Sequence, residues 1–503
     1  MADTVREIER KYEAADGQKL PDLTKVSGVR TVVAEDPVVL DATYYDTDDR
    51  RLAAAGITLR RRTGGSDAGW HLKLPVAPGV RDEIQVPLAD ELPRRLTALV
   101  RSRTRDLPLV PQVRIVSDRA VRRLLAADGT PLAEVSVDHV TAHRLTAGAP
   151  TATWTEVEAE LAPDQDETVL AAVGKKLRKA GLKPARSASK LARALTETGA
   201  APPAELPRAT GEDGTAAAVV LAYLTAQADA LVRLDAAVRR DLPDSVHQMR
   251  VATRRTRSAF TSYRKVLDRT VTDPIGAELK WLAAELGVDR DREVLTERIR
   301  AGVEDLPRHL VTGPVRGRIR TWSTARRQGS RRHITAVLDS RRYLDLLAAL
   351  DALLAAPPLR KAAAQPAADV LTAAIGKDFA RVAALIDTAL AEPAGGERSE
   401  AMHEARKRAK RARYAAELAR PVLGKDAKSF VKDMTGLQEL LGDHQDSVVA
   451  RDALRDIAAQ AAAAGESAFT YGVLYGREEA RAADRERELP ALWAEVSSPA
   501  VID

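Results

Sequence analysis

The sequence contains no cysteine, so disulfide bonds and thiolate metal sites are excluded. Aromatic residues make up only 4% of the chain, which leaves few side chains for the base-stacking platforms by which proteins bind single-stranded nucleic acid. No run of about 18 uncharged apolar residues occurs, and the first residues lack the apolar segment of a secretory signal. We therefore expect a cytoplasmic protein with no membrane span, a location that the absence of cysteine also fits.

The sequence also lacks a large excess of either charge, because 78 Lys and Arg residues are nearly balanced by 72 Asp and Glu residues, which gives a net charge of +6. This excess is small for 503 residues, a length that predicts two or three domains. The clustering of the positive charges matters more, since a local run of one sign creates the field that attracts a polyanion.

The pattern of apolar residues changes near residue 200. Before it, short segments alternate apolar and polar residues with the period of strands, at 5–13, 57–63, 70–75, 133–140 and 154–161. Helical patterns lie between them at 21–26 and 164–180. After a stretch rich in Pro, Gly and Ala, long Ala/Leu/Arg segments have helical periodicity. We predict an α+β protein in which an antiparallel β-domain (1–200) and a linker (201–214) precede an all-α domain (215–503).

One pattern occurs twice in the helical half, with every member shifted by 156 residues. The first copy is His247, Arg250, Arg254, Arg255 and Arg257, and the second is His403, Arg406, Lys410, Arg411 and Arg413. Downstream, LGVDRD at 286–291 is echoed by LGDHQD at 441–446. A duplicated multi-helix unit explains both, and it predicts a pseudo-twofold helical bundle with repeats at about 215–390 and 391–495.

The spacing within each copy places the basic residues along one stripe of a helix. Residues 245–267 hold six Lys or Arg and no acid. Like charges four residues apart destabilise a helix by a few tenths of a kcal/mol per pair, so an anionic partner would relieve this cost. A solvated basic face is the alternative, but two matching copies that each begin with histidine favour a phosphate-rich ligand, since Arg suits phosphate oxygens. Nucleic acid is disfavoured because no aromatic residue interleaves with the arginines.

Charged residues also alternate along the predicted strands of the N-terminal half. Acidic sets recur at Glu7 and Glu9 and at 156, 158 and 160, while basic pairs such as Arg60 and Arg62 lie on other strands. Such faces are usually solvated, but here the intervening residues are apolar enough to pack outward. If the sheet closed into a barrel, acidic and basic clusters would face each other inside it. That arrangement suits a complex of Mg²⁺ or Mn²⁺ with triphosphate, because carboxylates bind hard cations while Arg and Lys neutralise phosphate.

Two family resemblances follow from these motifs. The paired H-x-x-R-x-x-x-[RK]-R-x-R segments with their LG-x-x-x-D echoes resemble CHAD domains, the conserved-histidine α-helical domains. E-x-E-x-K at 7–11, YYDT at 44–47, T-L-R-x-R at 58–62, W-x-L-K-L at 70–74 and E-V-E-A-E-L at 156–161, in this order, resemble the CYTH superfamily of triphosphate tunnel metalloenzymes. The first resemblance implies binding of inorganic polyphosphate with no established reaction, and the second implies an eight-stranded antiparallel tunnel.

The resemblances also imply roles for individual residues. Lys11, Glu7 and Glu9 are the expected catalytic residues. The expected ligands of Mg²⁺ or Mn²⁺ are Glu7, Glu9, Asp138 and members of the set Glu156, Glu158 and Glu160. The triphosphate would be held by Lys11, Arg60, Arg62, Lys73, Arg119 and Lys190. Polyphosphate would bind the ten His, Arg and Lys residues of the two repeats.

We therefore expect a metal-dependent inorganic triphosphatase that the helical domain tethers to polyphosphate, in the cytoplasm and associated with polyphosphate granules. A polyphosphate-binding adaptor without turnover is one alternative. An enzyme acting on an organic triphosphate, such as a thiamine triphosphatase or an adenylate cyclase, is another.

Overall fold

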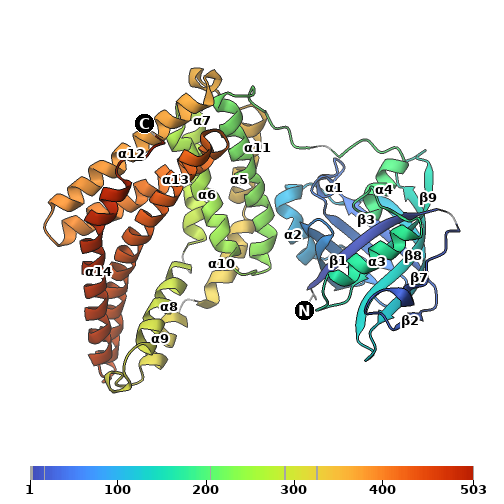
Figure 1. The fold of residues 1–503 in the computed structure, drawn as a ribbon, viewed down its shortest axis with the longest axis horizontal. Helices are drawn as coiled ribbons and strands as arrows, with labels where there is room; N and C mark the ends of the chain where they lie inside the picture. Colours follow the sequence, from blue (N-terminus) through green and yellow to red (C-terminus); the bar gives the residue numbers. More distant parts are fainter. Residues whose placement is uncertain (1–3, 16, 204, 288–289, 325–326, 502–503) are drawn as a thin grey trace. The chain divides into compact units, whose positions relative to one another are not determined.

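The computed structural model describes residues 4–15, 17–203, 205–287, 290–324 and 327–501. These fall into two units, Met1–Glu205 and Leu206–Asp503, which Figure 1 draws as a β-rich and a helical part. Each unit is described by itself.

The first unit is built on a closed barrel of eight antiparallel strands. The barrel closes because β9 pairs with β1 as well as with β8, in the order β1-β6-β5-β4-β3-β7-β8-β9. The prediction of an eight-stranded antiparallel barrel is confirmed. Two short strands, β2 (Thr31–Ala34) and β10 (Lys183–Pro184), pair with β7 and β1. The barrel strands are β1 (Thr4–Ala14), β3 (Val38–Asp46), β4 (Thr58–Thr63), β5 (Gly69–Ala77), β6 (Val80–Pro87), β7 (Val110–Leu125), β8 (Pro131–Arg144) and β9 (Thr151–Leu161).

Alternation along the strands places apolar residues outside the barrel and charged residues inside it. On β9, Val157 and Ala159 pack outward against Leu170 and Val173 of helix α3 (Thr168–Lys179). Glu156, on the opposite face, is buried. The remaining helical elements of this unit are the 3₁₀ turn η1 (Leu23–Lys25), where a helix is predicted over 21–26, and α1 (Arg51–Ala54), α2 (Arg94–Thr104) and α4 (Lys190–Glu197).

Helix α4 closes one end of the barrel. Its first turn is capped by Ser189, whose Oγ accepts a hydrogen bond from Ala192 N at 3.1 Å. Leu191 and Leu195 then pack on Ile115 and Trp154, which share the inward face of their strands with Arg119 and Glu156. This apolar plug leaves the charged part of the interior beside the start of α4.

The second unit is helical over its described residues, as predicted. Helix α13 is bent where Gly424 has a φ of 53°. The elements are α5 (Ala216–Arg239), α6 (Ser245–Ser262), α7 (Arg269–Glu285), α8 (Arg290–Glu304), η2 (Arg308–Leu310), α9 (Val315–Thr324), α10 (Arg327–Asp339), α11 (Arg341–Ala355), η3 (Lys361–Ala364), α12 (Ala367–Ala391), α13 (Gly396–Ala463) and α14 (Phe469–Val496).

Helix α6 and the first part of α13 carry the two basic stripes, and both pack into one apolar core. Met249 and Phe260 of α6 are buried there with Met402 and Ala409 of α13. Helix α5 is long and apolar enough to cross a membrane by length and composition alone. This is weak evidence for a span, because its apolar residues such as Leu224 belong to the same buried core.

Candidate functional site in the barrel and on the paired helices

The inward-facing charged residues of the barrel surround a cavity of about 510 Å³. Its described lining holds seven acidic and seven basic side chains, so the wall is neutral overall. Most strands contribute one sign, although β6 contributes both Arg81 and Glu83. Acidic residues on β1 and β9 and basic residues on β4, β5 and β7 account for most of the predicted site: Glu7, Glu158, Glu160, Arg60, Arg62, Lys73, Arg119 and, from α4, Lys190.

The register of β1 and β9 brings the predicted carboxylates together. Glu9 lies directly opposite Glu160, and Lys11 lies opposite Glu158. Like charges directly opposite each other in a sheet are destabilising. Burial, together with the charges of Glu7 and Glu9, raises the pKa of Glu160 to about 8. Burial also acts to raise the pKa of Glu9, but the Lys11 ammonium outweighs it and the pKa lies below its ordinary value.

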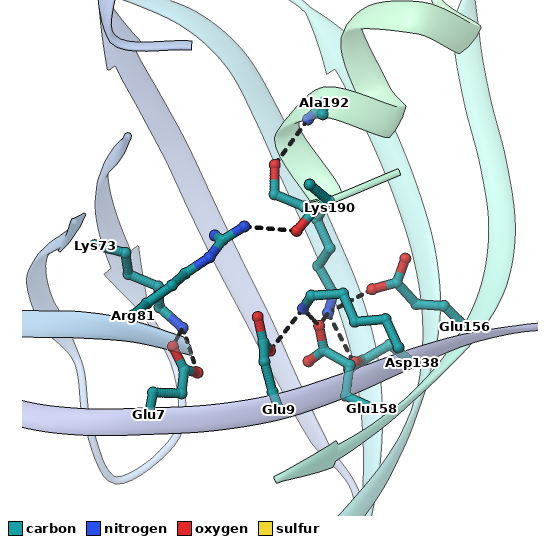
Figure 2. A network of polar contacts seen from close by, with 12 residues as sticks. Glu7, Glu9, Lys73, Arg81, Asp138, Glu156, Glu158, Lys190 and Ala192 are labelled. Atoms are coloured by element: carbon teal, nitrogen blue, oxygen red, sulfur yellow. Dashed lines mark hydrogen bonds and ion pairs between the residues drawn. The ribbon is translucent and has the colours of Figure 1, made fainter. Parts of the chain in front are cut away.

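A second acidic cluster lies beside α4, where Asp138, Glu156 and Glu158 each have a carboxylate oxygen within 4.8 Å of the others. Lys190 reaches down among them from the start of α4 (Figure 2). Its Nζ lies 3.1 Å from Asp138 Oδ2 and 2.7 Å from both Glu156 Oε1 and Glu158 Oε1. This cluster is therefore neutralised by a lysine within the chain.

Arg119 and Lys11 complete the neutralisation of this second cluster. Arg119 donates to Asp138 Oδ1 and to Glu158 Oε2, both at 2.7 Å. Lys11 pairs with Glu158 and lies 2.8 Å from Glu9 Oε2. Burial would raise the pKa of Asp138 and of Glu158, but these cations hold both below the ordinary range.

The basic wall lies across β4 and β5. Lys73 Nζ donates to both carboxylate oxygens of Glu7, at 2.6 and 2.7 Å (Figure 2). Arg62 pairs with Asp67, yet burial and the neighbouring Arg60 lower the pKa of Arg62 to about 9. The buried Nε atoms of Arg60 and Arg62 have no hydrogen-bond partner among the described residues. This wall therefore brings positive charge to the cavity, and two of its buried N–H groups have no partner among the described residues.

Several residues of the cavity are not part of the site predicted from the sequence. Glu83 lines the cavity, accepts from His71 Nδ1 at 2.8 Å and lies 3.7 Å from Arg60 Nη2. Tyr44 Oη accepts from Arg60 Nη1 at 3.3 Å; burial acts to raise its pKa, but Arg60 holds it below the usual value. Glu83 and His71 belong to the charge alternation of their strands and Tyr44 to the YYDT motif, so the signal was present in the sequence.

The carboxylates fit a hard divalent cation, because every donor is an oxygen. Burial and the charges of Glu7 and Glu9 raise the pKa of Glu160 despite the nearby Lys73, whereas the cluster beside α4 is already paired with Lys190 and Arg119. A cation would therefore be most favourable at Glu160, with Glu7 and Glu9 beside it.

In the helical unit, the two basic stripes converge on one cavity of about 840 Å³. Eight of the ten predicted residues line it: His247, Arg250, Arg254, Arg255, His403, Arg406, Lys410 and Arg413. Burial, followed by the charges of Arg406 and Arg254, lowers the pKa of Lys410 to about 8. The stripes thus form one strongly positive site.

Arg257 and Arg411, the other two predicted residues, do not line this cavity. The two repeats also differ in their ion pairs, because Glu417 pairs with Arg255 at 2.8 Å and with Arg413 at 3.2 Å. The position 156 residues earlier holds the uncharged Thr261.

Comparisons with known proteins agree with this division of the chain. A model of the CYTH domain family matches residues 5–195, and one of the CHAD domain family matches residues 222–455. The uncharacterized protein Rv2226 of Mycobacterium tuberculosis is 39% identical over 497 residues, which cover 96% of this chain and 94% of the relative.

Two solved structures resemble part of the chain. PptA from Streptomyces chartreusis has 20% identity and a TM-score of 0.47, over 56% of this chain and 99% of that one. The CHAD domain from the plant Ricinus communis has 25% identity and a TM-score of 0.44, over 59% of this chain and 97% of that one.

Proposed function

We propose a function on the basis of the family to which the chain belongs, that of proteins in which a CYTH domain is followed by a CHAD domain. Its barrel hydrolyses the terminal phosphoryl group of inorganic triphosphate. CYTH domains are metal-dependent, and members of the family are triphosphatases or cyclases. The observation that carries the proposal is the charge in the barrel cavity, where neighbouring carboxylates on β1 and β9 raise the pKa of Glu160 while Arg60, Arg62 and Arg119 line the same cavity.

This neutral but divided wall suits a metal–triphosphate complex better than either ion alone. Glu7, Glu9 and Glu160, with Glu158 nearby, would hold Mg²⁺ or Mn²⁺. The bound cation would supply a Lewis acid that polarises phosphoryl oxygens. Arg60, Arg62 and Arg119 would hold the phosphate chain, because guanidinium groups match phosphate oxygens in pairs. Binding of both ions would replace the ion pairs that now join the two sides.

Positioning and charge stabilisation dominate phosphoryl transfer, so no protein nucleophile is required. Two lysines pair with the carboxylates of the acidic side. Lys11 pairs with Glu9 and Glu158, and Lys73 pairs with Glu7. With these carboxylates engaged by a bound cation, both ammonium groups would be free to turn to the phosphate oxygens. Lys190 would stay with Asp138 and Glu156, where it fixes the carboxylates next to the phosphate.

The helical cavity would bind inorganic polyphosphate through its converging basic residues. A polyanion held by one domain raises the local concentration of phosphate chains available to the other. The proposal therefore includes a tether, and with it a cytoplasmic location at polyphosphate granules.

The test is phosphate release from tripolyphosphate with Mg²⁺ or Mn²⁺, compared between the parent protein and Glu9→Ala. We expect metal-dependent release by the parent and its loss in the variant. Asp118→Asn is the matched control, because it removes an exposed carboxylate next to Arg119 on the outer face of the same barrel. Release that does not depend on metal, or that survives in Glu9→Ala, would contradict the enzymatic proposal.

The same experiment separates the alternatives. Polyphosphate binding without any release would make the protein an adaptor. Preferential turnover of ATP or thiamine triphosphate in a substrate panel would assign an organic substrate.

A further inference from the structure

The glycine of the repeated Leu-Gly element does not adopt a backbone conformation that favours glycine. Gly287 lies two residues after Glu285, the last residue of α7. Gly442 lies 155 residues later, inside α13. Neither has the positive φ that favours glycine. A glycine within a helix costs about 1 kcal/mol relative to alanine. The reason for glycine therefore lies in the space that its missing side chain leaves.

That space is occupied in both repeats by the guanidinium of a cavity arginine. A Cβ atom at Gly442 would lie 3.1 Å from Nη2 and 3.3 Å from Nε of Arg406. A Cβ atom at Gly287 would lie 2.9 Å from Nη2 of Arg250 and 3.1 Å from the backbone oxygen of Ala283. Ordinary contacts of a Cβ atom begin at 3.4 Å, so alanine at Gly442 would force the Arg406 guanidinium to shift by a few tenths of an ångström, and alanine at Gly287 would displace both neighbours.

The two arginines occupy equivalent positions in the stripes and both line the helical cavity. Few other contacts fix the Arg406 guanidinium. Asp446 Oδ1 lies 3.9 Å from its Nη2, and its buried Nε has no hydrogen-bond partner among the described residues. Contact with the bare backbone of Gly442 is thus a main determinant of where this guanidinium lies.

We propose that Gly287 and Gly442 are positioning residues for the anion site, each holding one arginine at the depth and tilt that phosphate binding requires. The inference rests on the proposed binding of polyphosphate by this cavity. Because guanidinium binds phosphate through a planar pair of N–H groups, a tilt of this plane weakens binding although the charge is kept.

The experiment replaces the glycines by alanine in the full-length chain. Gly442→Ala and Gly287→Ala should each bind inorganic polyphosphate about tenfold more weakly in calorimetry, the loss expected for one charge-assisted hydrogen bond. Gly436→Ala is the matched control, because Gly436 also lies in α13 and a Cβ there meets no atom within 4 Å. It should raise the melting temperature and leave the affinity unchanged.

A double-mutant cycle shows whether the glycine acts through the arginine. Arg406→Ala should weaken binding, and adding Gly442→Ala to it should cause no further loss. Parent-like affinity in Gly442→Ala, or losses that add in full, would overturn the inference. An unfolded Gly442→Ala protein would also overturn it, unless a folded Gly287→Ala variant shows the tenfold loss.

A crystal structure of Gly442→Ala tests the glycine without relying on polyphosphate. If Arg406→Ala binds polyphosphate as the parent does, the proposed binding site is wrong. The position of the Arg406 guanidinium then decides: a displaced guanidinium supports the positioning role, and an unmoved one refutes it.

Discussion

Replacing Glu160 by glutamine tests whether burial and the neighbouring carboxylates hold the pKa of Glu160 above its ordinary value. The pKa of Glu160 rises from 4.5 to about 8 on folding, so the folded protein holds more protons than the unfolded chain between these values. Stability must then fall as the pH rises from 4.5 to about 8. The full shift corresponds to a loss of about 5 kcal/mol, which solvent reduces to a few kcal/mol because the side chain is not fully buried.

Glu160→Gln removes this titration, so the metal-free variant should match the parent near pH 4.5 and exceed it by a few kcal/mol at pH 8.5. Hydrogen exchange of peptides from β1 and β9, with a chelator present, reports the local free energy of opening in a chain of two units. Asp118→Asn should follow the parent at both pH values. The reasoning would be refuted if the free energy of opening differed between the parent and Glu160→Gln by the same amount at pH 4.5 and at pH 8.5. It would also be refuted if the two proteins did not differ at either pH.

Three further predictions concern the helices and the barrel. Arg250→Ala and Arg406→Ala should each lower polyphosphate affinity about tenfold while release of phosphate from tripolyphosphate continues; loss of both activities would contradict separate sites. Polyphosphate affinity should fall as the pH rises through about 8, where Lys410 loses its charge, and Lys410→Arg should remove this dependence. Calorimetry in which the affinities of parent and variant change equally with pH would argue against it. Gly174→Ala should destabilise the barrel by about 1–3 kcal/mol, because its Cβ would meet the Tyr12 hydroxyl; thermal unfolding at the parent's temperature would disprove the close contact.

The alternation of residues along single strands was sufficient to predict which side chains face the interior. Glu156 and Val157 lie on opposite faces because strand periodicity is two, and eight of the twelve charged residues expected in the barrel site line the cavity. The pairing of strands was not predictable from that alternation. Glu9 lies opposite Glu160 through a register between strands about 150 residues apart, and the closeness of Glu7 and Glu9 on β1 adds to burial in raising the pKa of Glu160.

Contacts that long side chains make between distant elements are also not predictable from the sequence pattern. Lys190 was placed in the phosphate set from a resemblance, but its ion pairs with Asp138 and Glu156 depend on the way α4 closes the barrel. The duplication predicts two equivalent stripes, whereas Arg255 of the first copy lines the cavity and its counterpart Arg411 of the second does not. The limits of the linker and of the repeats, and the roles assigned to the site residues, stay predictions.

The central claim is that the barrel interior binds a metal–triphosphate complex by exchanging internal ion pairs for ligand contacts. A crystal structure with tripolyphosphate and Mn²⁺ tests it most directly, since Mn²⁺ is located by its anomalous scattering. We predict Mn²⁺ on Glu7, Glu9 and Glu160, phosphate oxygens on Arg60 and Arg62, and Lys73 released from Glu7. Tripolyphosphate bound only outside the barrel, with the Lys73–Glu7 pair intact, would contradict the account.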